Sequence, residues 1–248
     1  MKITNRKTWR VPRTARLPFV KHALGVDTLP GGLKILDWGS NFGNLLVDGI
    51  ESGEIDPIDY TGVDVDQIVL FQAAEEVPEA TWIYRPITTP AYSRYLLQDE
   101  EDIELQPNFY DLIVVYSVFT HDVKSAMDDD LRKLYDALKP GGKLLMTYLQ
   151  PEAVKRIFIP KRISEYGSSA NPEEFDNISE YTYLINNDIV TDNPDIDDIN
   201  DIQYFLSTYN VEWINGYVKN NFDFVDVKQI NTLLIDKNWY HDALLLTK

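Results

Sequence analysis

The sequence feature that most constrains the fold is a short apolar run, followed by a glycine-containing turn and a second apolar run. Residues 33–46 read LKILDWGSNFGNLL, which predicts a strand, a tight turn and the start of a helix. Glycines at 39 and 43 allow the backbone to turn sharply and to approach a ligand closely. The helix that follows presents its free N–H groups and the positive end of its dipole to that ligand. The segment therefore predicts a nucleotide-type cofactor site in an α/β fold.

A carboxylate further along the chain predicts how a ribose is held. A second short strand, residues 60–64, ends in Asp64, 21 residues after Gly43. One carboxylate can accept hydrogen bonds from both hydroxyls of a ribose. A turn that binds a dinucleotide requires the spacing G-x-G-x-x-G, and here Asn41 and Asn44 occupy the positions of its second and third glycines. The pattern therefore disfavours nicotinamide and flavin dinucleotides.

These blocks resemble a known family. Asp37, Gly39 and Gly43 match D/E-x-G-x-x-x-G, the first motif of the class I S-adenosylmethionine-dependent methyltransferases. Other blocks that resemble this family follow in its order: GVDVD at 62–66, YDLIVVYSVFTH at 110–121, a helix and PGG turn within 131–148, and two closing strands beginning at 221 and 242. The resemblance covers roughly residues 33–150 and 210–248.

The resemblance implies a fold and a cofactor. The fold is a Rossmann-like seven-stranded, mostly parallel sheet with helices on both faces, an antiparallel C-terminal strand, and a cap or lid insertion before the last two strands. The implied cofactor is S-adenosyl-L-methionine, with Asp64 as the ribose-binding acid. The residues that the resemblance assigns to this cofactor are Asp37, Gly39, Ser40, Asn41, Gly43, Asp64, Val65, Ser117, Val118 and Phe119. Phe119 suits an ordinary core position equally well.

The chain departs from the family after the third strand. The family commonly has an acidic residue there, which contacts the adenine amino group, whereas this chain has Tyr84-Arg85-Pro86. The adenine contact is therefore unassigned. The acidic run at 99–102 follows, and we interpret it as a solvated loop.

Strand and helix patterns alternate along the chain, which is typical of a parallel sheet. We predict a single methyltransferase domain, residues 1–248, in which Pro140-Gly141-Gly142 ends a helix begun near Asp122 and Asn210 caps a C-terminal helix. Its segments are a basic N-terminal arm or helix (1–32), a cofactor-binding core (33–150), a substrate-cap insertion (151–209), and a closing helix with a strand pair (210–248).

Methyl transfer requires the protein mainly to align the acceptor and to exclude water. A hydroxyl acceptor must also lose a proton, and we predict His121 as the base or acceptor-orienting group. Alternatively, His121 bonds within its loop or contacts the cofactor. Asp122 either orients the imidazole or caps the next helix. We expect His241 to be structural, and Tyr148 and Gln150, at the end of the fifth strand, to face the acceptor.

The insertion is expected to determine the acceptor. Its aromatic residues suit either a packed lid or stacking on an acceptor. They are Phe158, Tyr166, Phe175, Tyr181, Tyr183, Tyr204, Phe205 and Tyr209. Its acidic stretch, 188–201, lacks the calcium-loop pattern, because Asn200 and Leu206 stand where that loop needs glycine and glutamate. We predict no metal site, and a small-molecule acceptor with a hydroxyl on a sugar, glycan or secondary metabolite.

The distribution of charge along the chain indicates which classes of partner can bind. The net charge is −17, yet residues 1–22 hold seven of the 23 Lys and Arg and no acid. The acidic remainder disfavours nucleic acid, because it repels a phosphate backbone. The arm interleaves bases with apolar residues, which suits packing on the domain. The family resemblance implies in addition a leading helix over the cofactor pocket, in which Arg13 or Arg16 would meet the methionine carboxylate or an anionic substrate. The alternatives are an RNA or protein methyltransferase anchored by the arm, and a non-catalytic cofactor-binding module.

The sequence has no cysteine, which excludes disulfides and cysteine-ligated metals. It also lacks a membrane-spanning apolar run and a secretory signal. We therefore expect a cytoplasmic protein without a membrane partner, of undetermined oligomeric state.

Overall fold

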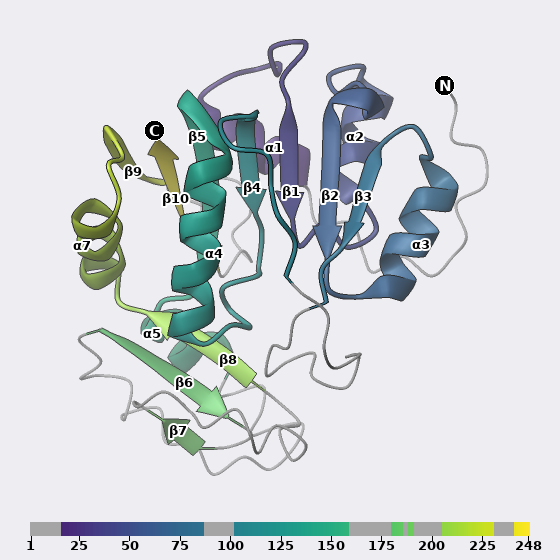
Figure 1. Cartoon of the computed structure of the whole chain (residues 1–248). Coiled ribbons are helices and arrows are strands. Elements are labelled where there is room, and N and C mark those ends of the chain that lie inside the picture. Colours follow the sequence, from purple (N-terminus) through teal and green to yellow (C-terminus); the bar gives the residue numbers. More distant parts are fainter. Residues whose placement is uncertain (1–15, 87–101, 159–179, 186–187, 191–204, 231–240) are drawn as a thin grey trace.

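A seven-stranded sheet forms the centre of the computed structural model, which describes residues 16–86, 102–158, 180–185, 188–190, 205–230 and 241–248. The strand order is β3-β2-β1-β4-β5-β10-β9 (Figure 1). The first five strands run parallel, and β10 is antiparallel to both neighbours. The strands are β1 (Ile35–Trp38), β2 (Tyr60–Asp64), β3 (Thr81–Tyr84), β4 (Tyr110–Val115), β5 (Leu138–Tyr148), β9 (Asp226–Ile230) and β10 (Asp242–Thr247). The predicted Rossmann-like sheet with its antiparallel C-terminal strand is confirmed.

Helices cover both faces of this sheet. Helices α1 (Arg16–Leu24) and α2 (Asn44–Ser52) bury their apolar side chains on one face. Helices α4 (Lys124–Ala137) and α7 (Val211–Asn221) do so on the other, with α4 in front of the sheet and α1 behind it in Figure 1. Strand β4 is buried on both sides, as its continuous apolar run predicts.

Among the described elements, two α-helices begin at side-chain caps. The Asp66 carboxylate accepts the N–H groups of Ile68 and Val69 at the start of α3 (Gln67–Glu76). The amide oxygen of Asn210 accepts two backbone N–H groups at the start of α7, as predicted. A short 3-10 turn, η1 (Pro57–Asp59), precedes β2. Each cap satisfies N–H groups that the first turn of a helix leaves without intrahelical partners.

The prediction that Pro140-Gly141-Gly142 ends the preceding helix is wrong. Helix α4 ends at Ala137, and the Pro-Gly-Gly segment lies inside β5. The β4–β5 register moves from Tyr110 opposite Leu138 to Leu112 opposite Lys143, so the segment is an irregularity in the pairing of the two strands. Pro140 has no N–H to donate and Gly141 has φ 79°, which interrupts the ladder without ending the strand.

The insertion contains a second, smaller sheet. After α5 (Pro151–Ala153) and a π-helical turn, η3 (Val154–Phe158), three antiparallel strands follow in the order β7-β6-β8. They are β6 (Tyr181–Ile185), β7 (Asp188–Val190) and β8 (Phe205–Tyr209). This sheet lies at the edge where the parallel strands end (Figure 1). Tyr166, Phe175, Tyr204, most of the acidic stretch and the arm residues 1–15 lie outside the described residues.

Aromatic rings join the insertion to the main domain. Tyr209 and Trp213 stack with ring centroids 6.0 Å apart, and Tyr181 lies 5.3 Å from the same indole. The hydroxyl of Tyr183 accepts the backbone N–H of Lys124 at 2.9 Å. Tyr183 and Tyr209 are completely buried. These three tyrosines therefore act as packing residues that fix the insertion against α4 and α7. In the described part of the chain, no helix is long and apolar enough to cross a membrane.

Candidate functional site

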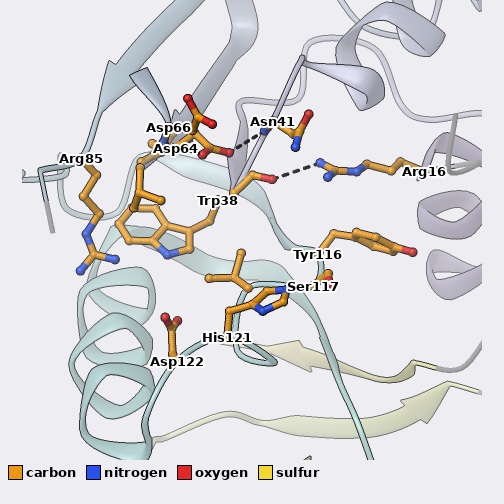
Figure 2. Close-up of a pocket in the computed structure, with 14 residues that line it drawn as sticks. Arg16, Trp38, Asn41, Asp64, Asp66, Arg85, Tyr116, Ser117, His121 and Asp122 are labelled. Atoms are coloured by element: carbon orange, nitrogen blue, oxygen red, sulfur yellow. Dashed lines mark hydrogen bonds between the residues drawn. The ribbon is translucent and has the colours of Figure 1, made fainter. Parts of the chain in front are cut away.

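A cavity of about 200 Å³ opens at the edge of the sheet where β1, β2 and β4 end (Figure 2). Loops at the carboxyl ends of parallel strands are the usual ligand-binding position in open α/β sheets. The lining residues are Arg16, Trp38, Gly39, Asn41, Val63, Asp64, Val65, Asp66, Arg85, Tyr116, Ser117, Val118, His121 and Asp122.

Asp64, at the end of β2, is held by backbone N–H groups. One carboxylate oxygen accepts the N–H of Asn41 at 2.7 Å, and the other accepts that of Asp66 at 2.9 Å. Burial raises the pKa of Asp64, and these two hydrogen bonds oppose the rise. A carboxylate has about four acceptor positions, so each oxygen retains one for a ligand. The geometry therefore fits the ribose diol of S-adenosylmethionine.

Both glycines of the turn after β1 have left-handed backbone, and each lies close to another side chain. Gly39 has φ 79°, and a Cβ there would lie 2.3 Å from Cγ2 of Val118 on the opposite cavity wall. Gly43 has φ 67°, and a Cβ there would lie 2.5 Å from the Trp82 ring. Left-handed backbone of this kind favours glycine. Gly39 and Asn41 line the cavity, whereas Gly43 starts α2 and lets it pack closely on β3.

Arg16, the first residue of α1, extends into the cavity wall. Its Nη1 donates to the carboxylate of Asp37 at 3.4 Å and to the carbonyl of Gly39 at 3.3 Å. The guanidinium lies 4.9 Å from the ring centroid of Tyr116. Asp37 is completely buried and also accepts the hydroxyl of Tyr60 at 2.7 Å. Burial raises the pKa of Asp37, and Arg16 opposes this rise.

The opposite wall is the loop after β4. Ser117 has φ 59°, and its N–H donates to the hydroxyl of Thr147 at 2.8 Å. The N–H of His121 donates to the carbonyl of Val118 at 2.8 Å, which closes the loop. His241 packs behind, with Nε2 3.1 Å from the hydroxyl of Ser117. Burial, together with the electrostatic effect of His121, lowers the pKa of His241 to about 3 and keeps its imidazole neutral.

Strand β8 of the insertion supports this same loop. The N–H of Ser207 donates to the carbonyl of Thr120 at 2.8 Å, and its hydroxyl donates to the carbonyl of Asp122. The hydroxyl of Tyr209 donates to the carbonyl of Phe119 at 3.4 Å. The insertion therefore fixes the backbone that carries His121.

A charged cluster, buried apart from the exposed Asp102, closes the end of the cavity near β3. The guanidinium of Arg85 lies 4.6 Å from the Trp38 ring centroid and donates to Asp102 at 2.8 Å and to Asp130 at 2.8 Å. The indole N–H of Trp38 also donates to Asp130 at 2.8 Å. These carboxylates hold the pKa of Arg85 above its ordinary value, and Arg85 lowers that of Asp102 to about 2.

The structure brings seven of the predicted site residues together around the cavity: Gly39, Asn41, Asp64, Val65, Ser117, Val118 and His121. Arg16, considered from the basic arm, joins them, while Arg13 lies outside the described residues. Phe119 and Tyr148 are completely buried in the core, and Ser40 is also buried. Gln150 bonds to Asp242.

Other lining residues were not predicted from the sequence: Trp38, Val63, Asp66, Arg85 and Tyr116. The one available signal was Arg85 itself, an arginine where an acid was expected. Asp122 also lines the cavity. Of the two alternatives for this residue, capping of the next helix is wrong, because Val123 occupies the cap position of α4.

The geometry agrees with comparisons to known proteins. Residues 36–146 match the sequence family described as a methyltransferase domain. No protein of established function matches the sequence at a significant level. Many solved structures match the fold. An S-adenosylmethionine-dependent methyltransferase from Mesorhizobium loti matches with TM-score 0.52 and 14% identity, and the match covers 89% of this chain and 94% of that protein.

The second is the 1,6-didemethyltoxoflavin-N1-methyltransferase of Burkholderia thailandensis, with bound 1,6-didemethyltoxoflavin and S-adenosylhomocysteine. It matches with TM-score 0.53 and 14% identity, and the match covers 94% of this chain and 77% of that protein. The third is an S-adenosylmethionine-dependent methyltransferase from Methanosarcina mazei. It matches with TM-score 0.52 and 12% identity, and the match covers 90% of this chain and 95% of that protein. At these identities the likeness establishes the fold.

Proposed function

The chain belongs to the class I S-adenosylmethionine-dependent methyltransferases, and we propose that this enzyme methylates a hydroxyl group of a small molecule such as a sugar, a glycan or a secondary metabolite. When bound, S-adenosylmethionine supplies an electrophilic methyl carbon. The protein must then hold the cofactor, align the acceptor and take up the acceptor's proton.

Three sets of residues fit the cofactor. Asp64 offers two acceptor positions at the ribose. Gly39 and Asn41 let the backbone pass close to the ligand in the turn after β1. Arg16 provides a positive charge at the far side of that turn, which suits the methionine carboxylate.

The observation that carries the proposal is the position of His121. It lies in the cavity wall across from Asp64, on a loop fixed by β8 (Figure 2). An imidazole has an ordinary pKa near 6.5 and accepts a proton readily at neutral pH. We propose that His121 accepts the proton that the acceptor hydroxyl releases as its oxygen attacks the methyl carbon. His241 is held neutral nearby and does not add a fixed positive charge to oppose this uptake.

Two features support a small acceptor. The insertion sheet lies at the edge of the main sheet where the parallel strands end, and it is hydrogen-bonded to the loop that carries His121. This arrangement suits a lid over a compact ligand. The chain's net charge of −17 opposes binding of a nucleic acid backbone.

The first test separates cofactor binding from catalysis. Calorimetric titration with S-adenosylhomocysteine should give micromolar binding that Asp64→Asn weakens by at least tenfold, because the ribose hydroxyls lose a charged acceptor. Asp129→Asn, on the exposed surface of α4, is the matched control and should bind as the natural protein does. Unchanged binding by Asp64→Asn would refute the assignment of the ribose site.

The second test identifies the acceptor atom. Radiolabelled methyl transfer would be measured on matched pairs that differ only in the acceptor group: phenols with anilines, and sugars with amino sugars. We expect transfer to the hydroxyl members, and His121→Gln should lower turnover by about 10²-fold or more while S-adenosylhomocysteine binds normally. Transfer only to amines, RNA or protein would contradict the proposal. Cofactor binding without transfer to any of these classes would indicate the non-catalytic alternative.

A further inference from the structure

Asp122 is a buried carboxyl group in the cavity wall. The residue is 2% exposed and lines the cavity, and in Figure 2 its carboxyl group points from the loop toward the Trp38 side. No hydrogen bond reaches its carboxyl oxygens from the residues that the structure describes. Burial and the neighbouring Asp130 raise its pKa well above the ordinary value. A buried polar group of this kind is costly unless a hydrogen-bonding partner arrives.

The backbone beneath Asp122 is firmly fixed. Its carbonyl accepts the hydroxyl of Ser207, and the hydroxyl of Tyr209 lies at 3.5 Å. The carboxyl group is therefore presented to the cavity from a rigid position, as a ligand-recognising group must be.

The surrounding charges limit which ligand can bind there. Arg85 is the one guanidinium at this end of the described cavity, and Asp102 and Asp130 already accept its N–H groups. With Asp122, three carboxyl groups surround one arginine. Because both carboxylates already engage the Arg85 guanidinium, an anion finds no available cation among the described residues at this end, whereas the acceptor oxygens of Asp122 favour an uncharged group that donates hydrogen bonds.

The cavity has two chemically different ends on either side of Asp64. Arg16 and Tyr116 lie at one end, and Trp38, Arg85 and Asp122 lie at the other (Figure 2). The anionic end of the cofactor suits the available face of Arg16. Its uncharged base is then directed to the acid-lined end, where the only exocyclic hydrogen-bond donor of adenine is its amino group.

We propose that Asp122 recognises the exocyclic amino group of the cofactor's base, replacing the acid that this chain lacks after β3. The side chains of Val65 and Val118 line the same cavity and offer apolar contacts for the flat ring. Arg85 and Asp130 act as positioning residues that set the charge around Asp122. The inference concerns the affinity for the cofactor and does not depend on the acceptor being a hydroxyl.

The test is a binding cycle that pairs a change in the protein with a change in the ligand. Dissociation constants would be measured by calorimetry for S-adenosylhomocysteine and for its analogue in which hydrogen replaces the amino group of the base. The natural protein should prefer S-adenosylhomocysteine by about tenfold. Asp122→Ala should reduce this preference to about twofold or less, and Asp122→Asn, whose amide oxygen still accepts, should keep part of it.

Asp129→Asn is the control. Asp129 lies on the exposed surface of α4 and does not line the cavity. This variant should keep the full preference. The proposal is overturned if Asp122→Ala and Asp122→Asn both keep the tenfold preference, if Asp122→Ala weakens both ligands equally, or if the natural protein shows no preference. The binding of Asp64→Asn tests the ribose site, whereas the preference shown by the Asp122 variants tests recognition of the base, so the two proposals can fail separately.

Discussion

Replacing Arg16 by methionine should destabilise the fold by about 3–5 kcal/mol, because the change leaves a buried carboxylate without its cation. The side chain of Arg16 is 7% exposed and that of its partner Asp37 is 0% exposed. Once Arg16 is removed, the hydroxyl of Tyr60 is the remaining side-chain donor to Asp37 in the described residues. For a chain of 248 residues, where 1 kcal/mol corresponds to about 2 °C, this loss lowers the Tm by roughly 6–10 °C.

The loss should depend on pH in a defined direction. Burial raises the pKa of Asp37 and Arg16 opposes the rise, so the variant's Asp37 has a still higher pKa. Below that pKa the folded variant holds a neutral carboxyl group and has no charge to bury. The difference in the free energy of unfolding between variant and natural protein is therefore smaller at pH 5 than at pH 8.

Urea unfolding at pH 5 and pH 8, followed by fluorescence, measures this difference. Arg16→Met combined with Asp37→Asn should recover at least half of the loss at pH 8, because no buried charge remains. Lys139→Met is the control, since its ion pair with Asp111 is about one third exposed on both sides and should cost less than about 1 kcal/mol. A loss for Arg16→Met no larger than the control's, or one equal at both pH values, would refute the reasoning.

Three further outcomes are expected. Gly39→Ala should lower the free energy of unfolding in urea by about 1–3 kcal/mol, and adding Val118→Ala should recover the part due to the 2.3 Å contact but not the part due to the positive φ. Asn210→Ala should cost about 1 kcal/mol in the same assay, and Asn210→Ser almost nothing, because serine also caps a helix. His241 has a folded-state pKa near 3, below its unfolded value, so it lowers stability as the pH falls from about 6.5, by at most about 1.4 kcal/mol per pH unit; His241→Gln should remove this component between pH 7 and pH 5.

The features that could be predicted from sequence are those encoded by neighbouring residues. The run from Tyr60 to Asp64 has the apolar pattern and terminal acid of a strand leading to a ribose site, and it forms β2 as expected. The capping role of Asn210 likewise depends on residues within one turn. Local pattern also predicted the order of strand and helix along the core.

Contacts between distant residues could not be predicted. Trp38 and Asp130 are 92 positions apart and Arg85 and Asp130 are 45 apart, and only the crossing of β1, β3 and α4 brings them together. The Pro-Gly-Gly segment was misinterpreted for a related reason: its residues interrupt a helix and a strand ladder equally well, and the pairing with β4 decides between them.

The attachment of β8 to the loop after β4 has a consequence for how this enzyme changes over evolution or in the laboratory. Ser207 and Tyr209 belong to the insertion that we propose covers the acceptor, yet they also bond to the carbonyls of Thr120 and Asp122. Under that proposal, a new insertion sequence that altered these two residues would also alter cofactor affinity and proton transfer. Acceptor range can be diversified independently only in those parts of the insertion that make no contact with this loop, so a successful lid exchange must carry β8 over unchanged.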